Sequence, residues 1–412
     1  MGTLKLMEYE WSDHPREVDY FVPDSWDVTI CEIAGAHRPP LTLQESKAKI
    51  DSPIASPTIR DLARGKKKVC ILFDDMSRGT PTWKIAPLVL EELKAAGIPD
   101  SSIEFICATG AHEAWDRAAL VKKVGPEIMA KYSVFNHMSF LSSQPLGKTS
   151  WGTRVEISSE VMSCDLKIAI CDISPHGSYG FSGGGKMIMP GVSSYESIAE
   201  HHGVTHRRSG PPGAPAPNFR SADNELLRDA IEFARMAKLD FSIHCILNPR
   251  AEVVDIFAGD VEASQRAGID EAKKHFVVPE SSDNDIAIAN AFCKANEANF
   301  AMSVAFRSVK RSGGTAVVIA NSHLGQIGHY LFGAWGKSYG GRIWHRMSPP
   351  EWVKHFLFYT EFPEGRNRER FAEKDLERVF FPSQWAEVVG RLMEWHGTKA
   401  KVAIFPDGTS QL

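Results

Sequence analysis

The sequence predicts an α/β protein of two domains, each with a mainly parallel sheet flanked by helices. Short, almost wholly apolar segments alternate with longer segments of helical periodicity, which is typical of parallel sheets covered on both faces. The length of 412 residues also exceeds what one hydrophobic core usually serves. We therefore expect domains at residues 1–278 and 279–412, with the active site in the cleft between them.

The predicted N-terminal domain shows the regular alternation most clearly. Its first sixty residues combine short alternating runs with Pro-rich connections, and predict one or two peripheral strands before a helix at 56–64. Apolar runs then predict strands at 68–73, 102–108, 165–171, 243–247 and 253–257. Helical periodicity predicts helices at 82–96, 113–124, 224–239 and 261–276. The Gly- and Pro-rich segment 203–219 is typical of a long surface loop or lid.

The predicted C-terminal domain follows a linker at 279–284. Apolar runs predict strands at 285–290, 313–320 and 401–405, and a helix that ends at 309–310. We expect this domain to close over the substrate.

Composition excludes several classes of protein. A formal net charge of −4, with no basic cluster beyond Lys66–Lys68, argues against nucleic-acid binding. No apolar window approaches a membrane span of about 20 residues, and the N-terminus lacks the apolar core of a signal peptide. The seven cysteines are scattered without a CxxC pair, as is usual for reduced thiols. We expect a cytoplasmic protein that does not bind membranes.

Polar clusters follow three of the predicted strands directly, at Asp74–Arg78, Thr109–Glu113 and Asp172–Lys186. The carboxyl ends of parallel strands lie at one edge of the sheet, where open α/β folds bind ligands. The sequence therefore predicts a ligand site built from these three clusters.

The first cluster combines the carboxylate of Asp75 with the guanidinium of Arg78. A planar donor fork suits recognition of a carboxylate or a phosphate. The alternative is a structural pair between these two side chains within the turn.

Histidines occur in the other two clusters, at His112 and His176. Either could be a general base near neutral pH, or simply a loop histidine bonded to nearby backbone. If they face a substrate from opposite sides, one could remove a proton and the other return it, as inversion at one carbon requires.

The third cluster also contains a Gly-rich loop that ends at Lys186. Residues 180–186 match the first seven positions of a nucleotide-binding phosphate loop, but Met187 replaces the hydroxyl that binds Mg²⁺. A nucleotide triphosphatase is therefore disfavoured, although the loop could hold one phosphate through backbone N–H groups. His202 ends a helical stretch, where a histidine is either a favourable terminal charge or, together with the other groups, a metal ligand.

These motifs together resemble the lactate racemase family. The resemblance rests on Asp75-x-Ser77-Arg78, on Thr109 to His112, and on Ser174-Pro175-His176. It rests equally on Gly183 to Lys186 and on the later His202, with ten residues from His176 to Lys186 and sixteen from Lys186 to His202.

The resemblance implies inversion of the C2 carbon of a 2-hydroxy acid by proton-coupled hydride transfer. It implies nickel and pyridinium-3,5-bisthiocarboxylic acid mononucleotide, a nickel-pincer nucleotide joined to Lys186 through a thioamide. His202 would complete the nickel coordination, and His112 and His176 would be the acid/base residues. The cofactor would further contact Asp75, Met76, Ser77, Arg78, Gly184 and Gly185, with Arg78 also binding the substrate carboxylate. The partners implied are the enzymes that make the cofactor: a carboxylase, a sulfur transferase and a nickel insertase.

The sequence departs from the family in the predicted C-terminal domain. The helix expected to face the substrate lacks the family's Tyr-Gln-x-x-Lys run, and Lys294 and Glu297 are the candidates to replace it. We therefore expect a substrate larger than lactate. Two alternatives stay open: a non-racemising redox reaction of a nickel-pincer enzyme on a hydroxy or sugar acid, and a non-catalytic protein that binds the cofactor or a nucleotide.

Overall fold

The computed structural model of the chain describes all residues except 1, 10, 12–16, 209–223, 332–347 and 372–376. It consists of two compact units. The central unit is Arg38–Lys274 with the segment that begins at His329, and the terminal unit contains Met1–His37, His275–Gly328 and the C-terminal part of the chain. This division differs from the single boundary predicted at residue 278, because the first 37 residues belong to the terminal unit.

The central unit is built on a six-stranded sheet in the order β13-β12-β9-β4-β5-β6. All neighbours are parallel except the β12–β13 pair. From the adjacent strands β4 and β9, the chain proceeds in opposite directions, through β5 to β6 and through β12 to β13. The carboxyl ends of β4 and β9 thus form a topological switch point, where ligands bind in open α/β sheets. The strands are β4 (Val69–Phe73), β5 (Ile103–Cys107), β6 (Ser133–Asn136), β9 (Leu166–Asp172), β12 (Phe241–Leu247) and β13 (Val253–Gly259).

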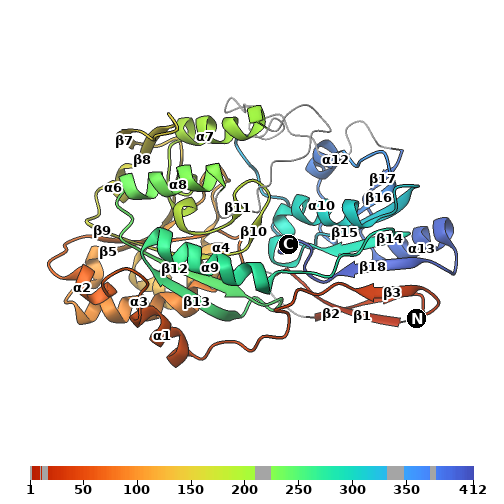
Figure 1. Cartoon of the computed structure of the whole chain (residues 1–412), viewed down its shortest axis with the longest axis horizontal. Coiled ribbons are helices and arrows are strands. Elements are labelled where there is room, and N and C mark those ends of the chain that lie inside the picture. The colour runs from red at the N-terminus through yellow and green to blue at the C-terminus, as the bar shows by residue number, and fades with distance from the viewer. Residues whose placement is uncertain (1, 10, 12–16, 209–223, 332–347, 372–376) are drawn as a thin grey trace. The chain divides into compact units, whose positions relative to one another are not determined.

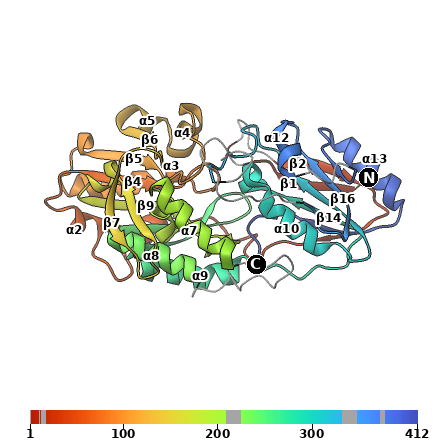
Figure 2. The same cartoon turned by 90° about the horizontal axis from the view of Figure 1, so that it is seen from above.

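Helices cover both faces of this sheet, with α4 and α5 on one side and α8 and α9 on the other (Figure 2). The main core packs β4 and β9 against α8 through side chains such as Leu72, Ala169 and Phe233. The helices are α1 (Leu43–Asp51), α2 (Ile59–Ala63), α3 (Thr82–Ala95), α4 (Arg117–Val124), α5 (Pro126–Lys131), α6 (Ser159–Met162), α7 (Tyr195–Arg208), α8 (Glu225–Met236) and α9 (Val261–His275).

Two of these helices differ from their predictions. The predicted helix at 113–124 begins only at Arg117, because the Asp116 side chain caps it by accepting from the Ala119 N–H. The predicted loop at 203–219 starts too early, since α7 continues to Arg208. Residues 209–219 lie outside the described part of the chain.

Short elements complete the central unit (Figure 1). Two antiparallel hairpins stand apart from the main sheet, and neither of them was predicted. They are β7–β8 (Ser143–Lys148 and Arg154–Ser158) and β10–β11 (Pro175–His176 and Gly180–Phe181). Single 3₁₀ turns are η1 (Asp100–Ser102) and η2 (Gly184–Met187).

The terminal unit contains a second, fully parallel sheet in the order β17-β16-β15-β14-β18-β3. The edge strand β3 pairs with β18, and side chains of the β1–β2 hairpin pack into the same core, which explains why the first residues belong here. Strands are β1 (Gly2–Met7), β2 (Glu17–Val22), β3 (Asp27–Ile30), β14 (Ile286–Asn290), β15 (Gly314–Ile319), β16 (Val353–Tyr359), β17 (Val379–Phe380) and β18 (Lys401–Phe405). Helical elements are η3 (Phe292–Glu297), α10 (Asn299–Ser308), α12 (Arg366–Phe371) and α13 (Trp385–His396).

Two further features concern the cysteines and the character of the helices. All seven cysteines are free thiols, and only Cys293 among them is not fully buried. Among the helices described, none has the length and apolar character needed to cross a bilayer.

Candidate functional site

The loop that follows β4 is anchored inside the central unit by two buried charges. Asp74 accepts hydrogen bonds from the Thr80 hydroxyl at 2.6 Å and from the Asp172 N–H at 2.9 Å, so it joins the ends of β4 and β9. Lys123 of α4, whose side chain is fully buried, pairs with Asp74 at 2.8 Å. The same ammonium donates to two backbone carbonyls of this loop, at 3.1 and 2.9 Å. These bonds fix the loop, because a buried cation is stable only when paired and hydrogen-bonded.

A carboxylate in this loop orients the first of the two predicted acid/base histidines. Asp75 Oδ1 accepts from the Ser77 N–H and hydroxyl at 2.9 and 2.5 Å, and its Oδ2 lies 2.7 Å from His112 Nδ1. Burial acts to raise the pKa of Asp75, but His112 and Arg78 outweigh it and hold that pKa well below its ordinary value. An ionised carboxylate can only accept, so Nδ1 of His112 carries the proton and Nε2 of the neutral ring is the basic nitrogen.

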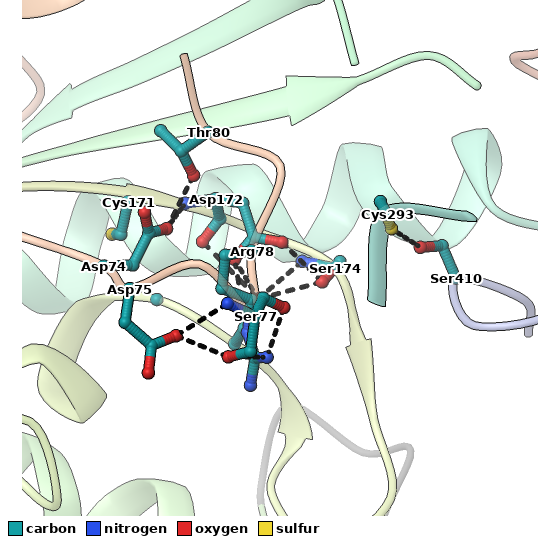
Figure 3. A network of polar contacts seen from close by, with 12 residues as sticks. Asp74, Asp75, Ser77, Arg78, Thr80, Cys171, Asp172, Ser174, Cys293 and Ser410 are labelled. Carbon is teal, nitrogen blue, oxygen red and sulfur yellow. Dashed lines mark hydrogen bonds and ion pairs between the residues drawn. The ribbon is translucent and has the colours of Figure 1, made fainter. Parts of the chain in front are cut away.

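Arg78 links the loop after β4 to the end of β9. Its Nε lies 4.0 Å from Asp172 Oδ1, and its Nη1 donates to the carbonyl and hydroxyl of Ser77 at 2.7 and 2.8 Å. Figure 3 shows Asp75, Ser77 and Arg78 on one loop, with Asp172 and Ser174 beside them. The guanidinium therefore spans two strand ends, a position from which its donor fork suits binding of a carboxylate.

The segment after β9 forms a small hairpin stabilised by Asp172 and two serines. Asp172 accepts from the hydroxyls of Ser174 and Ser182 at 2.7 and 2.8 Å. The Ser182 N–H donates to the Ser174 carbonyl at 2.9 Å, and the Ser174 N–H donates to the Ser182 hydroxyl at 2.8 Å. Asn224, the N-cap of α8, donates to the Ser178 carbonyl in the hairpin turn at 2.9 Å. The hairpin is thereby held from both the sheet and α8.

His176, at the end of β10, has the opposite hydrogen bonding to His112. Its Nδ1 accepts from the backbone N–H groups of Ser178 and Tyr179, at 3.2 and 3.4 Å. Because a backbone N–H can only donate, Nδ1 of His176 carries the lone pair, and Nε2 of the neutral ring carries the proton. The pair of histidines thus offers one basic nitrogen and one N–H donor.

The Gly-rich loop has close neighbours that explain its glycines. A Cβ on Gly184, whose φ is +55°, would lie 2.3 Å from the side chain of Gln265, and one on Gly185 would lie 2.6 Å from the backbone of Ala230. The loop leads into the 3₁₀ turn η2 rather than an α-helix. Close packing against α8 and α9 is therefore sufficient reason for these two glycines, and their predicted contact with the cofactor stays a prediction.

Tyr179, which the sequence did not single out, lies in the middle of the predicted groups. The Lys186 Nζ lies 3.7 Å from the centre of its ring. Ring centroids of His176, His201 and His202 lie 5.3, 5.5 and 6.0 Å from that of Tyr179. One buried phenol ring therefore contacts the predicted attachment lysine and borders both the acid/base residue His176 and the predicted nickel ligand.

His201 fixes the position of Tyr179 through a hydrogen bond. The Tyr179 hydroxyl lies 3.1 Å from His201 Nδ1, and His201 Nε2 lies 3.3 Å from the Leu226 carbonyl and 3.5 Å from Asp229 Oδ2. Burial lowers the pKa of His201 to about 3, Leu226 opposes this shift, and Lys186 adds to it. The neutral ring donates from Nε2 to the carbonyl, so its Nδ1 accepts from the tyrosine hydroxyl.

His329 is a further histidine at this site, which the sequence analysis left as a surface or packing residue. It forms an antiparallel bridge with His112, supported by a hydrogen bond from the Tyr330 N–H to the Ala111 carbonyl at 2.8 Å. Its ring centroid lies 5.3 Å from that of His112 and 6.4 Å from that of His202. His329 therefore extends the group of rings from the base to the predicted metal ligand.

The predicted residues from the first two-thirds of the chain all lie in the central unit, on the loops after β4, β5 and β9 and on α7. They are Asp75, Met76, Ser77, Arg78, His112, His176, Gly184, Gly185, Lys186 and His202. The ring contacts described above bring four of them together: His112, His176, Lys186 and His202.

The two predicted substrate residues lie in the terminal unit. Lys294 is fully buried, and its Nζ lies 5.1 Å from the centre of the Phe300 ring. Glu297 ends the 3₁₀ turn η3, so it precedes α10 instead of lying on it. Burial lowers the pKa of Arg370 to about 9, an effect that Glu297 opposes. The predicted contact of Lys294 and Glu297 with substrate stays a prediction.

Sequence reasoning could have found one of the missed residues. Lys123 follows Ala119 and Leu120 and precedes Val124 on the buried stripe of α4, and a lysine on such a stripe indicates a buried ion pair. Tyr179 and His329 carried no such signal, because an aromatic residue in a loop is as often a packing residue.

The described residues contain no group of three or more His, Cys, Asp or Glu side chains that could hold a metal ion. They do bring together a basic imidazole, an imidazole N–H, a primary amine and a guanidinium. This set can move a proton on and off an oxygen atom while a cation binds a nearby carboxylate.

The sequence and the fold are both similar to those of known proteins. Residues 14–210 match the family described as the lactate racemase N-terminal domain. The chain is 32% identical over 371 residues to the lactate racemase of Lactiplantibacillus plantarum, which spans 88% of this chain and 80% of that protein. It is 28% identical over 227 residues to that of Thermoanaerobacterium thermosaccharolyticum, across 54% and 51% of the two chains. Its fold is similar to the lactate racemase apoprotein structure from the latter organism, with a TM-score of 0.71, 20% identity, and 100% and 99% of the two chains covered.

Proposed function

Because the chain belongs to the lactate racemase family, we propose that it inverts the C2 carbon of a 2-hydroxy acid with a nickel-pincer nucleotide cofactor. Members of this family are isomerases, and the chain is an enzyme of the racemase and epimerase class. The observation that carries the proposal is the gathering of His112, His176, Lys186 and His202 at one edge of the central sheet.

The side chains present fit the proposed cofactor. Lys186 offers a primary amine that lies against an aromatic ring. A thiocarboxylic acid can be joined to this amine as a thioamide, with loss of water. His202 offers an imidazole that borders the same ring, and imidazole is a suitable ligand for nickel. The proposal assigns this one protein ligand to the metal and leaves the others to the cofactor.

When bound, the cofactor would supply the redox chemistry at C2, as an acceptor and donor of hydride. The chain's own residues supply position and proton transfer. His112 takes the hydroxyl proton at Nε2, and Asp75 stabilises the resulting imidazolium through Nδ1–H. Arg78 binds the substrate carboxylate. His176 is the acid/base residue of the opposite face: to return a proton to the oxygen from Nε2 and be left neutral, its ring must first be doubly protonated.

In the reverse direction the two histidines exchange roles. Protonation is harder for His176, because backbone N–H groups point at its Nδ1, whereas a carboxylate faces the ring of His112. Interconversion of two enantiomers has an equilibrium constant of one, so kcat/KM must be equal for the two enantiomers. This asymmetry can therefore make kcat and KM differ between them only in proportion.

The decisive experiment is to produce the chain together with the carboxylase, sulfur transferase and nickel insertase that make the cofactor. We expect a mass increment on Lys186, one nickel ion per modified chain, and chiral conversion of a 2-hydroxy acid. His202→Ala should lower the nickel content. His112→Gln and His176→Gln should retain the cofactor and lose turnover. An unmodified Lys186, or nickel without turnover of any acid tested, would contradict the proposal and favour a binding role.

The substrate is proposed to be larger than lactate, since Lys294, Glu297 and Phe300 occupy the segment where the family's substrate residues are expected. A panel of D- and L-2-hydroxy acids with methyl, aromatic and polyhydroxylated side chains tests this. Conversion of lactate at a kcat/KM equal to that of the larger acids would refute it.

A further inference from the structure

We propose that Tyr179 is the positioning residue that holds Lys186 and His202 in place for attachment of the cofactor, an inference that rests on the proposed function. Tyr179 contacts or borders His176, Lys186 and His202. The sequence motifs assign no role to Tyr179.

The ring of Tyr179 is a surface for the lysine side chain. At 3.7 Å from the ring centre, the Lys186 ammonium lies in direct contact with the aromatic face, where a cation is attracted by the ring's electrons. A planar thioamide can stack on the same face once the charge has been lost. The ring therefore supports the lysine both before and after attachment.

The tyrosine hydroxyl fixes the ring in place. It donates to His201 Nδ1 at 3.1 Å, and His201 donates in turn to the Leu226 carbonyl of α8 at 3.3 Å. The His201 ring lies almost parallel to that of Tyr179, at an interplanar angle of 14°. Tyr179 is 2% exposed, so its ring and hydroxyl are shielded from water.

The same residue connects the lysine to the acid/base group and to the metal ligand. The Tyr179 backbone N–H donates to His176 Nδ1 at 3.4 Å, and its ring borders His202 at 6.0 Å. Backbone and side chain therefore have separate roles. A side-chain substitution should disturb Lys186 and His202 while the backbone bond to His176 is kept.

The test compares three variants with wild type, all co-produced with the cofactor-making enzymes. Tyr179→Leu removes the ring and the hydroxyl, Tyr179→Phe removes the hydroxyl alone, and Phe105→Leu removes a fully buried aromatic ring on β5 as the matched control. The readouts are the fraction of Lys186 that carries the mass increment, nickel per chain, and Tm. In the apo-proteins, the rate of reductive methylation of Lys186 is measured by peptide mass spectrometry.

We expect Tyr179→Leu to lower the modified fraction and the nickel content by about 10-fold or more, as loss of a supporting residue around a metal site typically does. Tyr179→Phe should keep most of the modification, and Phe105→Leu should keep all of it at a comparable loss of Tm. In the Tyr179→Leu apo-protein, Lys186 should be methylated several-fold faster than in wild type, because the amine loses its contact with the ring.

Full modification of Tyr179→Leu would overturn the inference, and so would an equal loss in Phe105→Leu. If wild type itself stays unmodified, the proposed function fails. The rate of Lys186 methylation in the apo-proteins then tests the positioning role of Tyr179 by itself. An unchanged methylation rate in Tyr179→Leu then overturns its positioning role, and a faster rate supports it.

Discussion

His112 and His176 lie in the segments that follow two strands of the same sheet, β5 and β9, and the sequence gives them similar settings. Their surroundings in the structure are opposite. Nδ1 of His112 donates to the buried carboxylate of Asp75, within a network that also contains Asp74 and Lys123. Nδ1 of His176 accepts from backbone N–H groups, beside a neutral Tyr179–His201 pair. We call these the charged side and the neutral side of the site.

The comparison teaches that two histidines predicted for the same kind of chemistry need not be equivalent. A carboxylate at Nδ1 favours the imidazolium, so the charged side suits the stronger base. Backbone N–H groups at Nδ1 favour the neutral ring with its proton on Nε2, so the neutral side suits the donor. Substitutions on the two sides should therefore have unequal effects.

The largest effect is expected when the charged side loses its base. His112→Gln should lower kcat for racemisation by about 10³-fold, within the range typical of general base catalysis. Asp75→Asn should lower it by about 10²-fold, because the amide no longer stabilises the imidazolium. The double variant should lose little more than His112→Gln alone, since Asp75 acts through His112. Additive losses, measured by chiral chromatography on protein with full nickel content, would show that Asp75 has an independent role.

Removal of the cation on the charged side should cost stability. Lys123→Met leaves Asp74 buried without its ammonium partner, and should lower the free energy of unfolding by about 3–4 kcal/mol. Urea unfolding measures this change. Lys94→Met, at an exposed position on α3, is the matched control and should change that free energy by less than about 0.5 kcal/mol. A loss below 1 kcal/mol for Lys123→Met would mean that the charged side does not depend on this ion pair.

On the neutral side, His176→Gln should lower kcat by about 10²-fold, less than His112→Gln, because a glutamine amide can still donate a hydrogen bond to the substrate oxygen. Nickel content and the mass increment on Lys186 should be unchanged. The comparison fails if His176→Gln is as damaging as His112→Gln and Asp75→Asn leaves activity intact.

Mild acid should destabilise the neutral side first. Burial lowers the pKa of His201 to about 3, below the ordinary 6.5, so below pH 6.5 the unfolded chain binds a proton that the folded chain does not. Stability therefore falls as pH falls, by about 2 kcal/mol for this histidine at pH 5. Asp75 has a lowered pKa, so its contribution is kept until pH falls below its ordinary 3.8. His201→Gln should reduce the loss of unfolding free energy between pH 7 and pH 5, and an unchanged pH dependence would contradict this assignment.

Much of the site could be placed from the sequence, because it depends on local order along the chain. Strands such as Val69–Phe73 and Leu166–Asp172 are continuous apolar runs, and the polar groups come directly after them. Parallel strands bring their carboxyl ends to one edge, so Asp75, His112 and His176 were expected to lie near one another. The spacing from His176 through Lys186 to His202 could also be taken directly from the sequence.

Other features depended on contacts between distant segments. The first strands pair and pack with residues near the C-terminus. No local pattern in residues 1–37 predicts this pairing. Gly184 and Gly185 fit a phosphate loop by spacing, yet the structure shows Gln265 and Ala230 against them. His329 reaches His112 from more than two hundred residues away.

By itself, then, the sequence determined which residues stand at the sheet edge, since apolar periodicity fixes where each strand ends and which residue follows. Only the tertiary structure decided what each side chain does there. The role of an imidazole depends on whether a carboxylate or a backbone N–H faces its Nδ1, and the exposure of a lysine depends on what packs against it. Those partners, Asp75 for His112 and Tyr179 for Lys186, come into contact only when the chain folds.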